Sequence, residues 1–291
     1  MPLTVFESAC VVVVVLTLWT MSRARDLGAI VRDYAALAVA AWIGEDTSIA
    51  LYRFYAYAPD WHLRVHHVPI LVPLIWPLVI LSAREVVSKL WPELGRSRPL
   101  RALAVGALVA CDASLVEVVA VRANMWSWAE AGHLGVPLIG ILGWGCFALG
   151  ADLALSRKTH GRLATLLYGP LATHALILLL WWGLFRWTLR GALGSASVLG
   201  LAVLSALALV LVIRRRRAGQ AIPLDIAMPR MIAASLFVAL LVTTAPFDAA
   251  LWTHAACVAV PYFAATSYDL TSLRGRRSPE DPPGSRSPSP R

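Results

Sequence analysis

The chain has 291 residues, of which 58% are hydrophobic and only 15% are charged. Soluble globular domains carry about 25% charged residues, so this composition excludes an ordinary soluble protein and indicates a polytopic membrane protein. The formal net charge of +9 does not indicate nucleic-acid binding, because most of the basic residues fall on one predicted side of a membrane.

Apolar segments long enough to cross a bilayer, about 17 to 25 residues, recur along most of the chain. We predict nine transmembrane helices, or eight if the last two segments form one span. They cover roughly 5–21, 33–57, 66–87, 100–121, 136–155, 163–185, 192–213, 230–246 and 249–268. The sequence therefore predicts an all-α, polytopic transmembrane bundle over residues 1–273. Residues 274–291 are rich in Pro, Ser and Arg, so we expect a disordered cytoplasmic tail there.

The placement of Lys and Arg predicts the orientation of the chain. The connections 22–32, 88–101, 156–162 and 214–230, together with the C-terminal tail, hold most of these residues. Basic residues are enriched on the cytoplasmic side of membrane proteins. We therefore expect a bacterial inner-membrane protein with its N-terminus outside, its C-terminus in the cytoplasm and an odd number of spans.

Two stretches of the chain repeat each other, and each places an acid within an apolar segment. The first acid is 23 residues before a Val-Pro pair and the second is 24 residues before one, with a Trp 8 residues after the Val in both. Both copies run in the same direction through the membrane, which predicts a parallel repeat over 33–155. We expect the two acids to lie at similar depth and to face each other. The copies are Glu45, Val68-Pro69, Trp76 and Asp112, Val136-Pro137, Trp144.

Ionisable groups inside apolar helices are candidate functional residues, because their burial is unfavourable by a few kcal/mol or more. Glu45 falls on one predicted helical face with Tyr52 and Tyr55. Burial favours the neutral carboxyl group, which is the form that a proton donor needs. Asp46 lies on another face and is expected to pair with Arg53, whereas Glu117 could instead meet Arg122. The predicted catalytic residues are Glu45, Asp112, Glu117, Tyr52, Tyr55 and His67.

The histidines next to the first repeat suggest a metal site, which we weigh against a simpler interpretation. His62, His66 and His67 form an HxxxHH pattern that occurs in membrane di-iron desaturases and hydroxylases. Those enzymes need several such boxes and act at the cytoplasmic face, whereas this box lies on the predicted outer side. We therefore predict no metal and no cofactor, with His66 and His67 as interfacial polar residues or members of the acid–base set.

Four tryptophans are candidates for contact with an apolar substrate. An aromatic face can stabilise a carbocation through cation–π attraction or stack along a polyene. Ordinary packing and an outer aromatic belt are the alternatives. The predicted substrate-binding residues are Trp76, Trp126, Trp128 and Trp144.

These motifs resemble the carotenoid biosynthesis membrane proteins, a family that includes hydratases of carotenoid end groups. The resemblance covers Glu45 to Trp76 and Asp112 to Trp144. Its most specific parts are Tyr55-Ala-Tyr57, Trp126-Ser-Trp128, Gly135-Val-Pro-Leu138 and Gly143-Trp144. The family pattern has Asn where this chain has Gly140, and Gly where it has His67.

The resemblance implies an integral membrane enzyme that hydrates a terminal C=C bond of a carotenoid or related isoprenoid without a redox cofactor. Glu45 and Asp112 would serve as the acid–base pair. Isomerisation or cyclisation is the next possibility, and a proton-coupled transporter, a lipid-binding protein or a pathway scaffold are alternatives of other classes. Expected partners are membrane lipid, an apolar polyene or isoprenoid and other enzymes of the pathway, with no nucleic acid. The residues do not predict the oligomeric state.

Overall fold

The structure, a computed structural model, describes residues 3–22, 27–130, 132–157, 161–186, 195–217 and 222–266. Across these residues the chain is an all-α bundle with a few very short strands, which confirms the predicted fold class. The predicted tail, 274–291, lies outside the described residues.

Long helices make up most of the described chain. They are α1 (Leu3–Ser22), α2 (Leu27–Tyr52), α3 (Leu71–Leu90), α4 (Arg98–Arg122), α5 (Leu138–Leu155), α6 (Gly161–Leu176), α8 (Ser195–Arg217), α9 (Leu224–Thr244) and α10 (Ala249–Thr266). A π-helical segment, η2 (Ile177–Phe185), continues α6, and a 3₁₀ segment, η1 (Pro92–Arg96), links α3 to α4.

Seven helical segments among the described residues are long and apolar enough to cross a membrane. They are Leu3–Ser22, Leu27–Tyr52, Leu71–Leu90, Arg98–Arg122, Leu138–Leu155, Gly161–Phe185 and Ile226–Thr244. The protein is therefore a multi-pass membrane protein. The last two predicted spans are separate helices, because α9 ends at Thr244 and α10 begins at Ala249.

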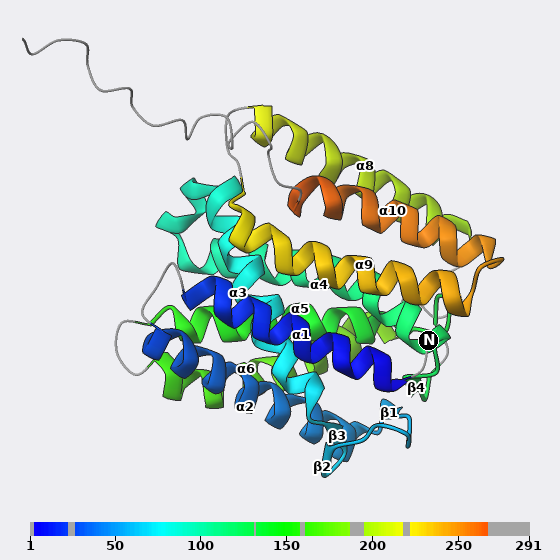
Figure 1. The fold of residues 1–291 in the computed structure, drawn as a ribbon, viewed down its shortest axis with the longest axis horizontal. Helices are drawn as coiled ribbons and strands as arrows, with labels where there is room; N and C mark the ends of the chain where they lie inside the picture. The colour runs from blue at the N-terminus through cyan, green and yellow to red at the C-terminus, as the bar shows by residue number, and fades with distance from the viewer. Residues whose placement is uncertain are drawn as a thin grey trace, which may run out of the picture.

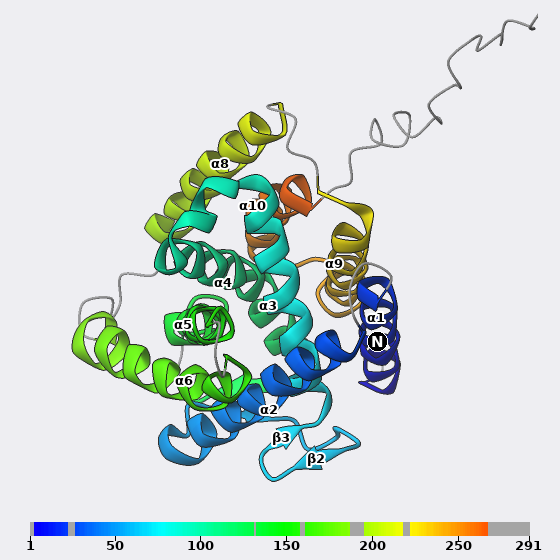
Figure 2. The same cartoon turned by 90° about the vertical axis from the view of Figure 1, so that its left-hand side faces the viewer.

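The helices lie side by side, and the short strands gather at one end of the bundle (Figure 1). Seen along the helices, α5 lies between α4 and α6 (Figure 2). Helix α2 packs against α6 and α3, α1 packs against α9, and α8 packs against α10. The helices that carry the predicted repeat, α2 to α5, therefore lie together in one half of the bundle.

Two of the predicted spans extend too far, because the chain changes from helix to strand at their ends. Helix α2 ends at Tyr52, where Arg53 has a φ of 52°, and α3 begins only at Leu71. Strand β1 (Tyr55–Tyr57) pairs antiparallel with β4 (Trp126–Trp128). Separately, β2 (Arg64–Val65) and β3 (Val68–Pro69) form a hairpin. The helical face predicted to include Tyr55 is thus wrong, since Tyr55 lies on a strand.

Two glycines allow α4 and α5 to approach each other closely. A Cβ atom on Gly106 would lie 2.7 Å from the carbonyl oxygen of Gly145. A side chain at this crossing would push the helices apart. The close contact fixes α4 relative to α5, and these two helices carry Glu117 and Trp144.

Candidate functional site

Glu45, in the last third of α2, is surrounded by aromatic hydrogen-bond donors. The hydroxyl groups of Tyr55 and Tyr57 both donate to Oε2, the latter at 3.1 Å. The indole Nε1 of Trp76 on α3 donates to Oε1 at 2.9 Å. Both carboxyl oxygens of this acid are therefore satisfied without water.

Glu117 on α4 has a closely similar set of donors. Trp126 and Trp128 on β4 donate to Oε2 at 2.8 and 3.0 Å. Trp144 on α5 donates to Oε1 at 2.8 Å. Glu117 itself is only 3% exposed. In both cases a strand supplies two aromatic donors to one oxygen, and the following long helix supplies an indole to the other.

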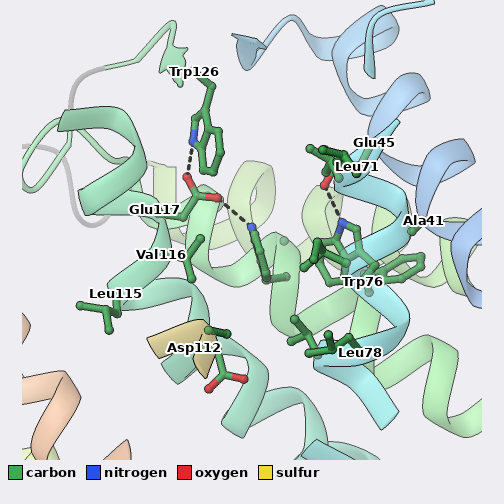
Figure 3. A pocket seen from close by; sticks show the side chains of 18 of the residues that line it. Ala41, Glu45, Leu71, Trp76, Leu78, Asp112, Leu115, Val116, Glu117 and Trp126 are labelled. Atoms are coloured by element: carbon green, nitrogen blue, oxygen red, sulfur yellow. Dashed lines mark hydrogen bonds between the residues drawn. The ribbon is translucent and has the colours of Figure 1, made fainter. Parts of the chain in front are cut away.

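The two sets of donors are in direct contact. Tyr55 on β1 and Trp128 on β4 have ring centroids 4.8 Å apart, and those of Trp76 and Trp144 are 4.5 Å apart. In Figure 3, Glu45 with Trp76 and Glu117 with Trp126 occupy facing sides of one pocket. The structure thus brings two buried carboxyl groups and their aromatic donors into a single site.

Strand periodicity explains how the aromatic residues reach the acids. In β1 and β4 the aromatic positions are half-buried, and the central residues, Ala56 and Ser127, are exposed. Alternate residues of a strand point to opposite faces. The Tyr-x-Tyr and Trp-x-Trp patterns therefore direct all four aromatic side chains of the paired strands toward the bundle.

The site faces an apolar cavity of about 180 Å³. Its walls come from α1, α2, α3, α4, α5 and α9, from the start of η2, and from the strands. Most lining side chains are apolar, and examples are Phe6, Val79, Ile139 and Phe237. Polar groups are few, and Glu45, Asp112 and Glu117 are among them. An apolar ligand with one reactive end matches this distribution.

Asp112 lines the same cavity but has a different partner from the one expected. The guanidinium of Arg230 on α9 donates from Nη2 to both carboxylate oxygens, at 2.7 and 2.8 Å. Its Nη1 also donates to the hydroxyl of Ser82 at 2.8 Å. Arg230 is 2% exposed, so this is a buried ion pair. The expected pairing of Asp112 with Glu45 does not occur, and Glu117 occupies that position instead.

Sequence spacing contained a signal for Glu117 that the Val-Pro alignment missed. Glu45 precedes Tyr55 and Tyr57 by 10 and 12 positions. Glu117 precedes Trp126 and Trp128 by 9 and 11 positions. The acid-to-aromatic spacing therefore pairs Glu45 with Glu117 to within one position, which is as close as the match that the Val-Pro spacing gives for Asp112. The alternative partner, Arg122, pairs with Asp248 at 3.2 Å.

Two of the predicted catalytic residues lie away from the carboxyl pair. The Tyr52 hydroxyl is 3.0 Å from Nδ1 of His174, whose Nε2 is 2.8 Å from the Thr47 hydroxyl. His67 contacts the carboxylate of Asp46. The expected Asp46–Arg53 pair is therefore replaced by contacts between Asp46 and the histidines of the β2–β3 turn.

The phenols of Tyr55 and Tyr57 remain donors across the ordinary pH range. Burial, and next the neighbouring Glu45 carboxylate, raise the pKa of both hydroxyls well above the usual value. A protonated phenol can hold a carboxylate in place but cannot act as the base of the site. The acid–base capacity of the cavity therefore lies in the carboxyl groups.

Comparison with known proteins identifies one family. A model of the carotenoid biosynthesis protein family matches residues 2–213. The matched segment includes Glu45, Glu117 and all their aromatic donors, whereas α9 with Arg230 lies beyond it. No match was found among curated proteins or solved structures.

Proposed function

The chain belongs to the carotenoid biosynthesis protein family, and we propose that it is a membrane enzyme that hydrates a terminal C=C bond of a carotenoid or related isoprenoid. One observation carries this proposal. Two buried carboxyl groups, each held by three aromatic donors, share one apolar cavity.

Glu45 and Glu117 would act as the acid–base pair. One carboxylic acid transfers its proton to the less substituted carbon of the terminal double bond, and a tertiary carbocation forms at the other carbon of that bond. The oxygen of a water molecule bonds to the cation, and the second carboxylate accepts the proton that this water loses. The product is a tertiary alcohol, and one proton has moved from one glutamate to the other. Two carboxyl groups in one water-poor site can hold different protonation states, as this sequence of steps requires.

The aromatic donors would stabilise the charged species in this reaction. The ring of Trp76, which is hydrogen-bonded to Glu45, and the ring of Trp144, which is hydrogen-bonded to Glu117, have centroids 4.5 Å apart, so their faces could attract a carbocation formed near both acids. Their N–H groups keep both carboxyl groups oriented. A polyene would occupy the remaining apolar cavity and place only its end group near the glutamates.

Asp112 takes a supporting role in this proposal. Its carboxylate accepts two hydrogen bonds from Arg230, so it is compensated before any substrate binds. We therefore replace Asp112 with Glu117 in the acid–base pair that the sequence suggested.

The proposal is tested by expressing the protein in a host that makes lycopene and analysing the pigments by mass. We expect the wild-type product to gain one water. Glu45→Gln and Glu117→Gln should each lower its yield about 100-fold or more, since general acid–base catalysis typically contributes a factor of this size. Glu93→Gln is the matched control, because Glu93 is exposed and pairs with Arg215 far from the cavity.

Two outcomes would contradict hydration through these residues. Full product from both glutamine variants, with membrane insertion unchanged, would remove Glu45 and Glu117 from the chemistry. A new pigment of unchanged mass would replace hydration with isomerisation or cyclisation of the end group.

A further inference from the structure

A second group of polar side chains lies outside the cavity, where α2 meets the β2–β3 hairpin. His66 and His67 form the turn of the hairpin, and both direct Nδ1 at the carboxylate of Asp46. His66 Nδ1 is 2.9 Å from each carboxylate oxygen, and His67 Nδ1 is 3.2 Å from Oδ1. One nitrogen or oxygen atom from each of the three residues lies within 4.8 Å of the others.

The surrounding structure holds these groups in place. The backbone N–H of His67 donates to Asp46 Oδ1 at 3.1 Å. The indole of Trp42 on α2 donates to the carbonyl of Val65 at 3.2 Å, which fixes the hairpin to the helix. The Asp46 side chain is 13% exposed, whereas those of His66 and His67 are 60% and 41% exposed. A buried anion is thus covered by two imidazoles that solvent can reach.

We propose that Asp46, His66 and His67 form a binding site for a divalent cation of the zinc type. Zinc in proteins binds imidazole nitrogen and carboxylate oxygen at about 2.0–2.2 Å, commonly with tetrahedral geometry. Tetrahedral ligands at that distance are roughly 3.4 Å apart. The present His–Asp separations of 2.9–3.2 Å would therefore need to open by only a few tenths of an ångström, and the ligand atoms of the two histidines lie within 4.8 Å of each other.

The types of ligand select this class of cation. Two imidazoles and one carboxylate suit zinc and its late transition-metal neighbours, whereas Mg²⁺ and Ca²⁺ favour oxygen ligands alone. To bind the cation, each Nδ1 must carry no proton, so each neutral ring would carry its proton on Nε2. Water would complete the coordination, since both imidazoles are open to solvent.

This site differs from the HxxxHH metal box considered in the sequence. His62 contacts Glu7 on α1 instead. The Glu7 carboxylate accepts hydrogen bonds from the backbone N–H of His62, at 3.1 Å, and from the His62 ring. The third ligand is Asp46, which is next to Glu45 in α2. A bound cation would tie the hairpin to the helix that carries Glu45 without taking part in the hydration itself.

Zinc titration of the full-length protein tests the site. The protein is purified in detergent with a histidine-free tag, treated with a chelator and titrated with Zn²⁺ in a calorimeter. We expect saturable binding of one Zn²⁺ per chain. Asp46→Asn, His66→Asn and His67→Ala should each weaken binding about 10- to 100-fold or more, since even second-shell changes have effects of this size.

His62→Ala is the matched control, because it removes a histidine of the same segment that lies outside the cluster. We expect its zinc affinity to stay within about twofold of the wild type. His66→Asn keeps the test valid if other variants misfold, because Asn tolerates the φ of 58° at this exposed turn. Zinc should also raise the thermal unfolding temperature of the wild type and His62→Ala, but not of Asp46→Asn.

The inference fails if the wild type shows no saturable zinc binding. It also fails if His66→Asn, eluting as a folded monodisperse protein, binds zinc as tightly as the wild type. Equal loss of affinity in His62→Ala would likewise overturn it. None of these results depends on the proposed hydration.

Discussion

At the scale of single residues, Glu45 and Glu117 each accept their hydrogen bonds from three aromatic side chains. A buried polar atom without a partner is unfavourable by about 1–3 kcal/mol, and more if it is charged. Phenol and indole groups can pair with a carboxylate and still present apolar ring surface to the cavity. This explains why the residues around Glu45 and Glu117 are Tyr and Trp, where Ser or Asn would also form hydrogen bonds but add polarity.

Gly140 provides the first residue-scale prediction, because it makes room for the Trp128 ring. A Cβ atom on Gly140 would lie 2.7 Å from Cζ2 of Trp128. Substitution by Ala, or by the Asn of the family pattern, should displace this ring and break its hydrogen bond to Glu117. We expect Gly140→Ala and Gly140→Asn to lower the free energy of unfolding by about 1–3 kcal/mol, the usual effect of overpacking.

Gly143 is a matched control for this prediction, since it lies one turn further along α5. The nearest atom to a Cβ there is Ile177 Cδ1 at 4.0 Å, an ordinary contact. Thermal unfolding in detergent should therefore be nearly unchanged in Gly143→Ala. Equal stability of Gly140→Asn and wild type would show that the Trp128 ring has freedom to move.

The sequence associated some residues that also lie together in the structure, and it missed other contacts for a physical reason. Glu45 and Trp76 could be associated through the spacing of one repeat, and they share a hydrogen bond. The choice between Asp112 and Glu117 depended on Arg230, a partner 118 positions away in sequence. Likewise, Tyr52 and Tyr55 fall on one face of an ideal helix, and only the break at Arg53 separates them.

At the scale of whole elements, apolar length predicted the helices well and their ends poorly. A long hydrophobic segment indicates a helix that crosses the lipid. Aromatic residues near a membrane surface occur in helices and in strands, so they do not mark where a helix ends. The pairing of β1 with β4 brings together segments that are far apart in sequence, so no local pattern predicts it. This pairing aligns α2 with α4 and places their two glutamates in the same cavity.

The ion pair between Asp112 on α4 and Arg230 on α9 gives a prediction for the packing of these two helices. Arg230→Met would leave the Asp112 carboxylate buried without its cation, and breaking a buried ion pair in this way costs about 3–5 kcal/mol. We expect the single variant to be strongly destabilised. The double variant Asp112→Leu/Arg230→Met should recover most of that loss, because no uncompensated charge remains. Thermal unfolding of the wild type, Asp112→Leu, Arg230→Met and the double variant measures the coupling energy between these two residues.

The same four proteins separate a structural role of Asp112 from a catalytic one. If the double variant is stable and still hydrates lycopene, Asp112 is dispensable for the chemistry and Glu117 is the better candidate. A stable double variant without product would restore Asp112 to the reaction. Additive effects of the two substitutions on stability would contradict the ion pair itself.

At the scale of the whole molecule, the cavity extends along the helices from the paired strands β1 and β4. Glu117 and Asp112 are five positions apart on α4, about 7.5 Å along the helix axis. Trp61, which is 5% exposed and lines the cavity, donates to the carbonyl of Met125 and packs over the strand end. The carboxyl pair therefore lies near the strand end of the bundle, and the Asp112–Arg230 pair lies deeper.

The last prediction concerns the side of the membrane on which this strand end lies. The distribution of Lys and Arg predicts that it lies outside the cytoplasm, with Asp60 external and Glu93, after α3, cytoplasmic. Both residues are exposed, which makes them suitable positions for single cysteines. In intact spheroplasts, a membrane-impermeant thiol reagent should label Asp60→Cys above the wild-type background. It should label Glu93→Cys only after permeabilisation. The reverse pattern would place the carboxyl pair near the cytoplasmic face, and the water that adds to the substrate would then come from that side.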